Sequence, residues 1–182
     1  EPKYKPKKWA KPLVEKSHNC YAYALNDHYS YTINKCKKIH QTNNNYKECS
    51  DLKPQPGNYS NTKNKYKKKF TCKNMIKKIK HDNKSLKLTS FNKRCPKRHY
   101  KAAIVVDPNN TYHFYRQDNQ LNWSHKPGIL PITNKDASGN PIYAPHLSDR
   151  NYDKSNNDGI NYTDFCSYFC VPNNDFIKTN AK

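Results

Sequence analysis

The spacing of apolar and polar positions predicts two helices in the first half of the chain. In residues 71–82, TCKNMIKKIKHD, apolar side chains recur every three or four residues behind a Thr, a residue type that caps helices. Residues 17–27, SHNCYAYALND, place small and aromatic residues after Ser17 and Asn19, either of which can cap a helix. This second helix therefore carries Cys20 in its first turn.

From residue 85 onward the period changes to that of strands. Residues 85–91 and 111–117 alternate, and residues 99–107 form an aliphatic strand. A further strand is expected in residues 119–128, where Pro and Gly end it. The middle of the chain is therefore predicted to be an antiparallel meander, and the aromatic segment 161–174 is predicted to be a short helix.

A length of 182 residues is that of one domain. Residues 1–16 are rich in Pro and Lys and predict an extended basic arm with Trp9 as an anchor. Residues 17–172 form the predicted domain, in which 28–50 is polar and irregular, and residues 173–182 form a polar tail.

Composition limits the classes of partner. The longest aliphatic run, residues 102–106, is far shorter than the ~20 residues of a membrane span, so no membrane span is expected. The net charge of +20 favours nonspecific contact with polyanions or nucleic acid. Specific nucleic-acid recognition is disfavoured, because nearly all of the basic residues are Lys, and a Lys, Asn and Tyr bias also follows from A/T-rich codons.

Seven cysteines are many for a reduced chain of this size, so a disulfide-permissive environment is expected. Three bridges and one free thiol are the simplest arrangement, and the spacing of Cys36 and Cys49 suits a bridge that closes a surface loop. No CxxC or HxxxH pair is present, and no metal or other cofactor is expected.

Cys20 is the candidate nucleophile, because a helix start lowers the pKa of a thiol. The alternative is a disulfide partner or a small buried residue. On the strand 111–117, His113 shares a face with Tyr115, and Phe114 points the other way. His125, twelve residues after His113, is expected to lie beside it on the neighbouring strand.

A helix-borne Cys, a Pro-Gly turn and a sheet that carries His resemble the papain-like hydrolases of the NlpC/P60 and CHAP type. The phrases HNCYAYALN, QPG, YHFYRQD, WSHKPG and FCSYFCVP are similar to an uncharacterised protein family of large double-stranded DNA viruses. The resemblance covers residues 17–172 as scattered motifs. It implies an α+β, papain-like fold with a Cys-bearing helix on an antiparallel sheet, and composition and the cysteine count predict that this fold is loop-rich and stapled by disulfides.

The resemblance also implies catalytic roles. Cys20 would be the nucleophile, His113 the base and His125 the orienting third residue, for which Asp118 competes. The Gly-Asp pair common after the Cys helix in that superfamily appears here only as a Pro-Gly pair. His18, next to the helix, is an alternative base.

Polar neighbours of these residues are candidates for substrate contacts. The backbone N–H of Cys20, with a second donor from Asn19 or Tyr21, would hold an oxyanion. Gln117 and Asp118 would contact polar groups of the substrate, or they simply form the charged end of a hairpin.

Two functions follow as hypotheses. The first is a cysteine hydrolase of the amidase or peptidase type, associated with a virus particle. The second is a catalytically inactive, basic structural protein of the virion, packed under a capsid or around a genome. Both place the chain in a virion, and in the host cytoplasm during assembly, with other virion proteins as partners.

Overall fold

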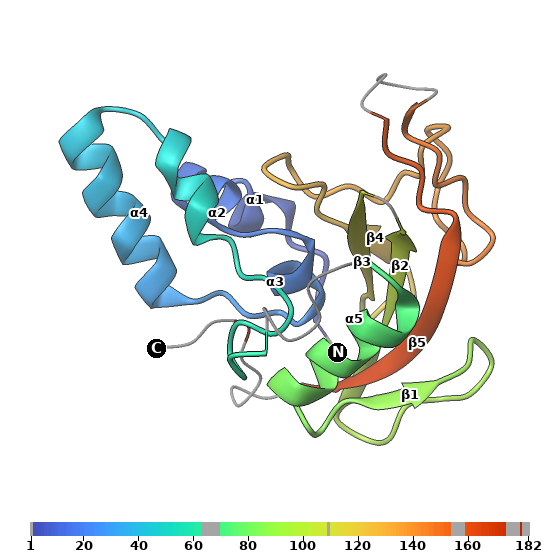
Figure 1. Cartoon of the computed structure of the whole chain (residues 1–182). Helices are drawn as coiled ribbons and strands as arrows, with labels where there is room; N and C mark the ends of the chain where they lie inside the picture. The colour runs from blue at the N-terminus through green and yellow to red at the C-terminus, as the bar shows by residue number, and fades with distance from the viewer. Residues whose placement is uncertain (1, 63–69, 109, 154–158, 174–178, 180–182) are drawn as a thin grey trace.

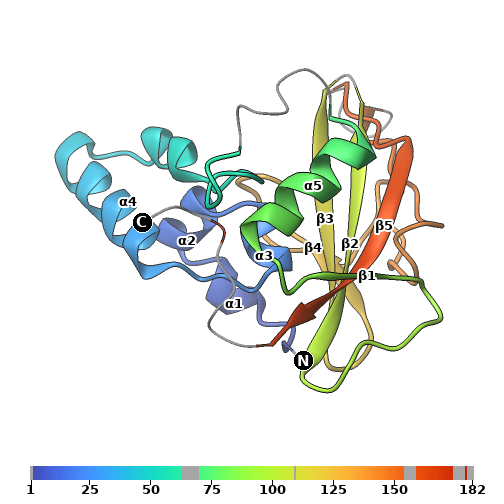
Figure 2. The same ribbon diagram turned by 60° about the horizontal axis from the view of Figure 1, so that its bottom comes forward.

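The computed structural model describes residues 2–62, 70–108, 110–153, 159–173 and 179. A five-stranded antiparallel sheet carries helices α3 and α5 on one face, and the other helices extend to one side of it (Figures 1 and 2). Three disulfides link distant parts of the chain. The prediction of a disulfide-stabilised α+β fold is confirmed.

The sheet has the order β1-β5-β2-β3-β4. Its strands are Lys87–Thr89 (β1), His99–Asp107 (β2), Thr111–Gln117 (β3), Trp123–His125 (β4) and Asp164–Pro172 (β5). The predicted meander is correct for β2, β3 and β4, which pair in sequence order. It is incomplete, because β5 lies between β1 and β2.

The C-terminal aromatic segment is a strand, so the helix predicted within residues 161–174 is wrong. Its side chains alternate between the two faces: Phe169 packs in one apolar cluster and Tyr168 in the other. Strand β5 pairs with β1 and β2 on its two sides. Tertiary pairing therefore decides the conformation of a segment whose local pattern is ambiguous.

Helices α3 and α5 confirm the two helices predicted from spacing. The six helical elements are Pro6–Trp9 (α1), Pro12–Ser17 (α2), Cys20–Ala24 (α3), Ser30–Asn43 (α4), the 3-10 helix Lys47–Leu52 (η1) and Cys72–Asp82 (α5). The Asn19 side chain accepts a hydrogen bond from the Ala22 N–H and caps α3. Thr71 caps α5 in the same way, through the N–H of Asn74.

Two segments that were expected to lack regular structure are helical. The arm 1–16 folds into α1 and α2, each of which starts with Pro, a residue preorganised for the first helical position. Trp9 anchors the arm as expected, because it is buried against Tyr23 with ring centroids 5.0 Å apart. In the polar segment 28–50, helix α4 buries mainly Thr32 and Cys36, so its sequence lacks a strong amphipathic signal.

The two faces of the sheet bury separate apolar clusters. The helix-covered face holds the cluster that includes Cys20, Met75, Ile79, Ile104 and Phe114. The opposite face holds a cluster built from β2, β3, β4, β5 and the segment after β4, namely Ala103, Val105, Tyr115, Trp123, Ile142, Tyr162 and Tyr168. Any residue of β3 therefore faces either the helices or the segment after β4.

The disulfides fix the periphery to this core. Cys36–Cys49 joins α4 to η1, as the spacing predicted, Cys72–Cys166 joins α5 to β5, and Cys95–Cys170 joins the β1–β2 connection to β5. The expected count of three bridges and one free thiol, Cys20, is confirmed.

The predicted tail 173–182 lies mostly outside the described residues. Within it, Thr179 is 1% exposed and donates hydrogen bonds from its N–H and hydroxyl to the Asp27 carboxylate, each at 2.8 Å.

Candidate functional site

Cys20 begins α3 as predicted, but its thiol lies in the core. The residue is 5% exposed and packs in the helix-side cluster with Phe114. Burial raises the pKa of the thiol to about 12, although the backbone of Phe114 and the charge of Lys126 act in the opposite direction. At neutral pH the group is therefore a neutral thiol, not a thiolate.

His113 lies on the other face of the sheet. It contacts Tyr115 and Tyr162, with ring centroids 5.2 and 5.3 Å away, and both tyrosines belong to the cluster opposite the helices. The backbone of β3 thus separates its imidazole from the thiol of Cys20. The structure does not bring this predicted nucleophile and base together.

His113 and His125 do meet, as the hairpin geometry predicted. The register pairs Tyr115 with His125, which puts His113 diagonally opposite on the same face. The Nε2 of His113 lies 2.7 Å from the Nδ1 of His125, whose Nε2 lies 2.9 Å from the carbonyl oxygen of Lys135. Burial lowers the pKa of His125 to about 4, and burial beside His125 lowers that of His113 well below its usual value.

A cavity of about 260 Å³ opens beside this histidine pair. Its lining is mostly apolar and comes from β3, β4 and the segments that follow them: His113, His125, Pro127, Gly128, Ile129, Leu130, Tyr152, Ile160 and Tyr162. Apolar cavities with few polar groups are the usual form of small-molecule sites.

The three residues predicted to contact substrate have local structural contacts. Asn19 caps α3 and donates to the carbonyl oxygen of Pro54 at 2.7 Å. The carboxylate of Asp118 accepts from the N–H groups of Gln120 and Asn122, which closes the β3–β4 turn. Asp118 therefore holds the hairpin rather than orienting an imidazole.

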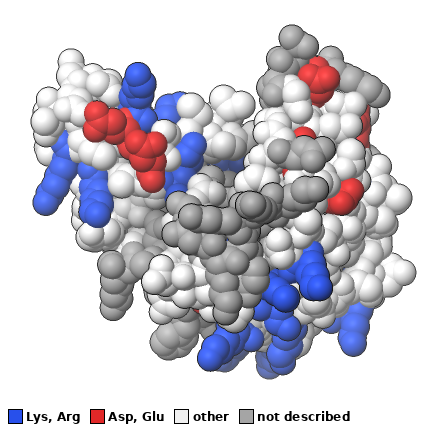
Figure 3. Space-filling model, in the orientation of Figure 1, with Lys and Arg blue, Asp and Glu red and all other residues white. Residues whose placement is uncertain are grey.

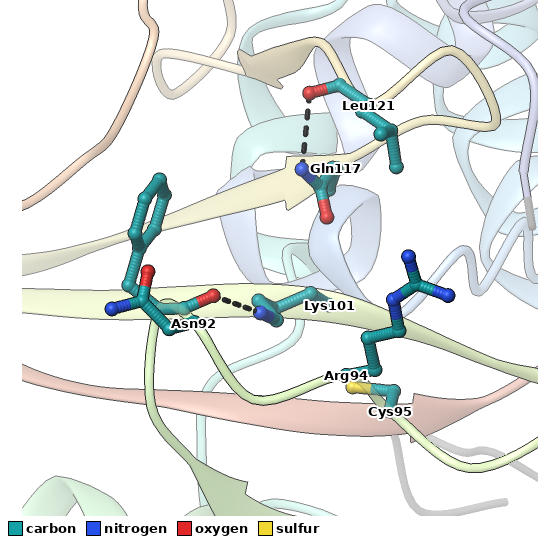
Figure 4. Close-up of a pocket in the computed structure, with 7 residues that line it drawn as sticks. Asn92, Arg94, Cys95, Lys101, Gln117 and Leu121 are labelled. Carbon is teal, nitrogen blue, oxygen red and sulfur yellow. Dashed lines mark hydrogen bonds between the residues drawn. The ribbon is translucent and has the colours of Figure 1, made fainter.

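Gln117 lies at the end of β3, where its amide donates to the carbonyl oxygen of Leu121 at 3.0 Å. It lines a second cavity of about 480 Å³, together with Phe91, Asn92, Arg94, Cys95, Lys101 and Leu121. Lys101 donates to the carbonyl oxygen of Phe91 there, and Cys95 is bridged (Figure 4).

His18, the alternative base, is also part of a packed network. It is 1% exposed, and its two ring nitrogens contact the Ser17 hydroxyl at 2.9 Å and the N–H of Tyr29 at 3.2 Å. Burial lowers its pKa to about 3. Both nitrogens thus have partners within the fold.

Lys126 is a buried charged residue that the sequence pattern did not indicate. It is 0% exposed, and its ammonium donates to the carbonyl oxygens of Glu15, Gly128 and Leu130 at 2.8, 2.8 and 3.1 Å. Burial lowers its pKa to about 8. One Lys among thirty gives no sequence signal, and only the preceding Trp-Ser-His marks a strand that would bury it.

Three carboxylates are bonded to the backbone of the fold, whereas Glu48 and Asp51 are exposed on η1, which is bridged to α4. Asp82, Asp118 and Asp136 accept hydrogen bonds from backbone N–H groups. In contrast, Lys35, Lys37 and Lys38 are exposed on α4, a helix without an acidic residue. Figure 3 shows Lys and Arg side chains over the helical region that contains α4, where acidic side chains lie between them, and below the sheet near β1.

No helix in the described part of the chain is long and apolar enough to cross a membrane. Among the same residues, no group of three or more His, Cys, Asp or Glu side chains is placed to hold a metal ion. The disulfides fit an oxidising, extracellular or secreted environment.

Comparison with known proteins gives one partial similarity. Over 48 residues, 26% of this chain, the sequence is 52% identical to Insoluble matrix shell protein 1 of Ruditapes philippinarum. The match spans 32% of that protein, about a third of its length. No protein-family model matches the chain, and no solved structure matches it.

Proposed function

We propose that the chain is a non-catalytic, disulfide-stabilised structural domain that binds polyanionic components of an insoluble matrix. The observation that carries this proposal is the position of Cys20 and His113 on opposite faces of β3, with the thiol buried and neutral. A cysteine hydrolase needs the thiol and an imidazole within hydrogen-bond reach.

The assignment to a matrix rests on two supports. The matched relative is named as a protein of an insoluble shell matrix, and 48 residues at 52% identity relate part of this chain to it. Three disulfides provide the resistance to unfolding that an extracellular structural component needs.

The basic surface supplies the binding chemistry. Helix α4 presents Lys35, Lys37 and Lys38 beside a surface groove, and the ammonium of Lys35 lies 4.5 Å from the ring centre of Tyr31. The Cys36–Cys49 bridge fixes the helix to η1, so these charges keep their spacing. Several ammonium groups on one face of a helix attract sulfate, phosphate or carboxylate polymers.

The papain-like assignment and hydrolase activity stay predictions. What favours them is the free thiol of Cys20 at a helix start that Asn19 caps. What they require is a different arrangement, in which the thiol leaves the core and meets an imidazole. The virion location and virion partners implied by the resemblance also stay predictions.

Retention on heparin, a soluble sulfated polyanion, tests the binding role. The full chain is expected to bind heparin at low salt and to be released as salt rises, while a neutral dextran does not retain it. The double variant Lys35→Glu/Lys38→Glu should elute at markedly lower salt than the wild type. The matched variant Lys84→Glu/Lys87→Glu has the same change in charge at exposed positions near β1 and should shift elution much less.

Two results would contradict this role. Binding that does not depend on salt would exclude an electrostatic mechanism. Equal shifts for the two double variants would show that α4 has no special part and that only net charge matters.

A further inference from the structure

The cavity beside His113 and His125 has a defined hydrogen-bonding character. The carbonyl oxygen of Lys135 can only accept, so the Nε2 of His125 must carry its proton. In a neutral imidazole the other nitrogen then accepts, and His113 must donate from Nε2 to the Nδ1 of His125. The Nδ1 of His113 is therefore left as an unprotonated acceptor.

Both imidazoles are neutral under ordinary conditions, since burial lowers the pKa of each. Within the described part of the chain no hydrogen bond reaches the Nδ1 of His113, although the residue is only 3% exposed. This nitrogen is not among the buried side-chain atoms that lack a partner, so it is accessible from the cavity, and a ligand that donates a hydrogen bond would take the place of water there.

The walls of the cavity fit a flat apolar body. The ring of Tyr162 lies 5.3 Å from that of His113, and the ring of Tyr152 lies 6.3 Å from that of His125. At the opening, Ile129 and Leu130 are 40% and 56% exposed and form an apolar lip. A volume of about 260 Å³ suits a single substituted ring.

The wall that carries Ile129 and Leu130 is held in place before any ligand binds. The buried ammonium of Lys126 donates to the carbonyl oxygens of Gly128 and Leu130 and ties the turn to α2 through Glu15. The backbone of His125 exchanges two hydrogen bonds with Thr133, at 2.8 and 2.9 Å. A preformed site does not need to be ordered by its ligand.

Other ligand classes fit less well. None of the described residues that line the cavity carries a charge at neutral pH, so an anion has no counter-charge there. Both nitrogens of His125 have hydrogen-bond partners, which leaves a single imidazole nitrogen, and one nitrogen is too few for a metal site.

We propose that this cavity binds a small neutral phenol, with the ring between Tyr152, Tyr162 and the Ile129–Leu130 lip and the hydroxyl donating to the Nδ1 of His113. The site goes beyond the structural role proposed above and does not depend on it, because α4 and this cavity lie on different parts of the molecule. It assigns to the histidine pair a binding role without catalysis.

Three ring compounds of similar shape test the proposal with the full chain. p-Cresol has a hydroxyl donor, 4-methylanisole has only an acceptor and toluene has neither. Titration followed by nuclear magnetic resonance is expected to show p-cresol binding at least about tenfold more tightly than 4-methylanisole. The nitrogen-15 signal of the His113 Nδ1 should shift with p-cresol and stay unchanged with toluene.

The variant His113→Phe keeps an aromatic ring and removes the acceptor. It is expected to abolish the preference for p-cresol over 4-methylanisole while toluene still binds. The nitrogen-15 measurement on the wild type decides the matter even if this variant does not fold. Equal affinity for the three compounds, an unchanged His113 signal on p-cresol binding, or no binding of p-cresol at millimolar concentration would each overturn the proposal.

Discussion

The protection of Cys20 is the most direct consequence of the structure for the hydrolase hypothesis. Burial raises the pKa of this thiol from 9.0 to about 12, so at neutral pH the thiolate fraction falls by a factor of about a thousand. Alkylation proceeds through the thiolate, and the side chain is also shielded from reagents by the core. We therefore expect the native protein to react with iodoacetamide at least about a thousandfold more slowly than an unfolded thiol at pH 7.5.

The assay is time-resolved alkylation of the nonreduced protein, with peptide mapping, between pH 6 and 9. The same protein in denaturant supplies the unfolded reference, and the three disulfides leave Cys20 as the free thiol. His113→Ala should leave the slow native rate unchanged, because this imidazole lies on the other face of the sheet. Rapid, selective alkylation of Cys20 below pH 7 that is lost in His113→Ala would refute this reasoning and restore the hydrolase hypothesis.

Three further predictions concern stability, each measured by urea denaturation. The double variant Cys72→Ala/Cys166→Ala removes a bridge across 94 residues and should lower the free energy of unfolding by ~4.7 kcal/mol. A loss below ~2 kcal/mol would contradict this prediction. Stability should fall from pH ~6.5 towards 4, since unfolding lets His18 and His125, with folded pKa values of about 3 and about 4, take up protons; a flat profile would contradict this. Asp82→Asn should lower the free energy of unfolding by ~3 kcal/mol, because this 4% exposed carboxylate accepts four hydrogen bonds. A loss below ~1 kcal/mol would mean that water replaces these hydrogen bonds.

Local periodicity predicted helix α5 and strands β2 and β3. Helix α5 has its apolar residues at helical spacing, and the alternation of β3 correctly placed His113 with Tyr115 and against Phe114. Helix α4 and strand β5 escaped prediction for opposite reasons. Helix α4 buries too few side chains to show a face, whereas the last five residues of β5 are all buried, and a short apolar run does not distinguish a strand from a buried helix.

The candidate site was predicted in part for a related reason. Alternation determines which residues of a strand share a face, and the hairpin spacing correctly predicted that His113 and His125 lie side by side. It does not determine which of the two faces a distant helix covers. The sequence motif therefore gave Cys20 and His113 the right elements but could not reveal that α3 covers the Phe114 side.

Separation of the two faces makes the two candidate chemistries independent. On one face, the thiol of Cys20 is a core group whose reactivity depends on opening α3 from the sheet. On the other face, the His113–His125 pair lines a cavity. Lys126 ties one wall of this cavity to α2. Cys20→Ala should thus leave p-cresol binding unchanged, and His113→Phe should leave the thiol protected. A cross effect would mean that the sheet transmits strain between its faces, and only then would one mechanism have to join them.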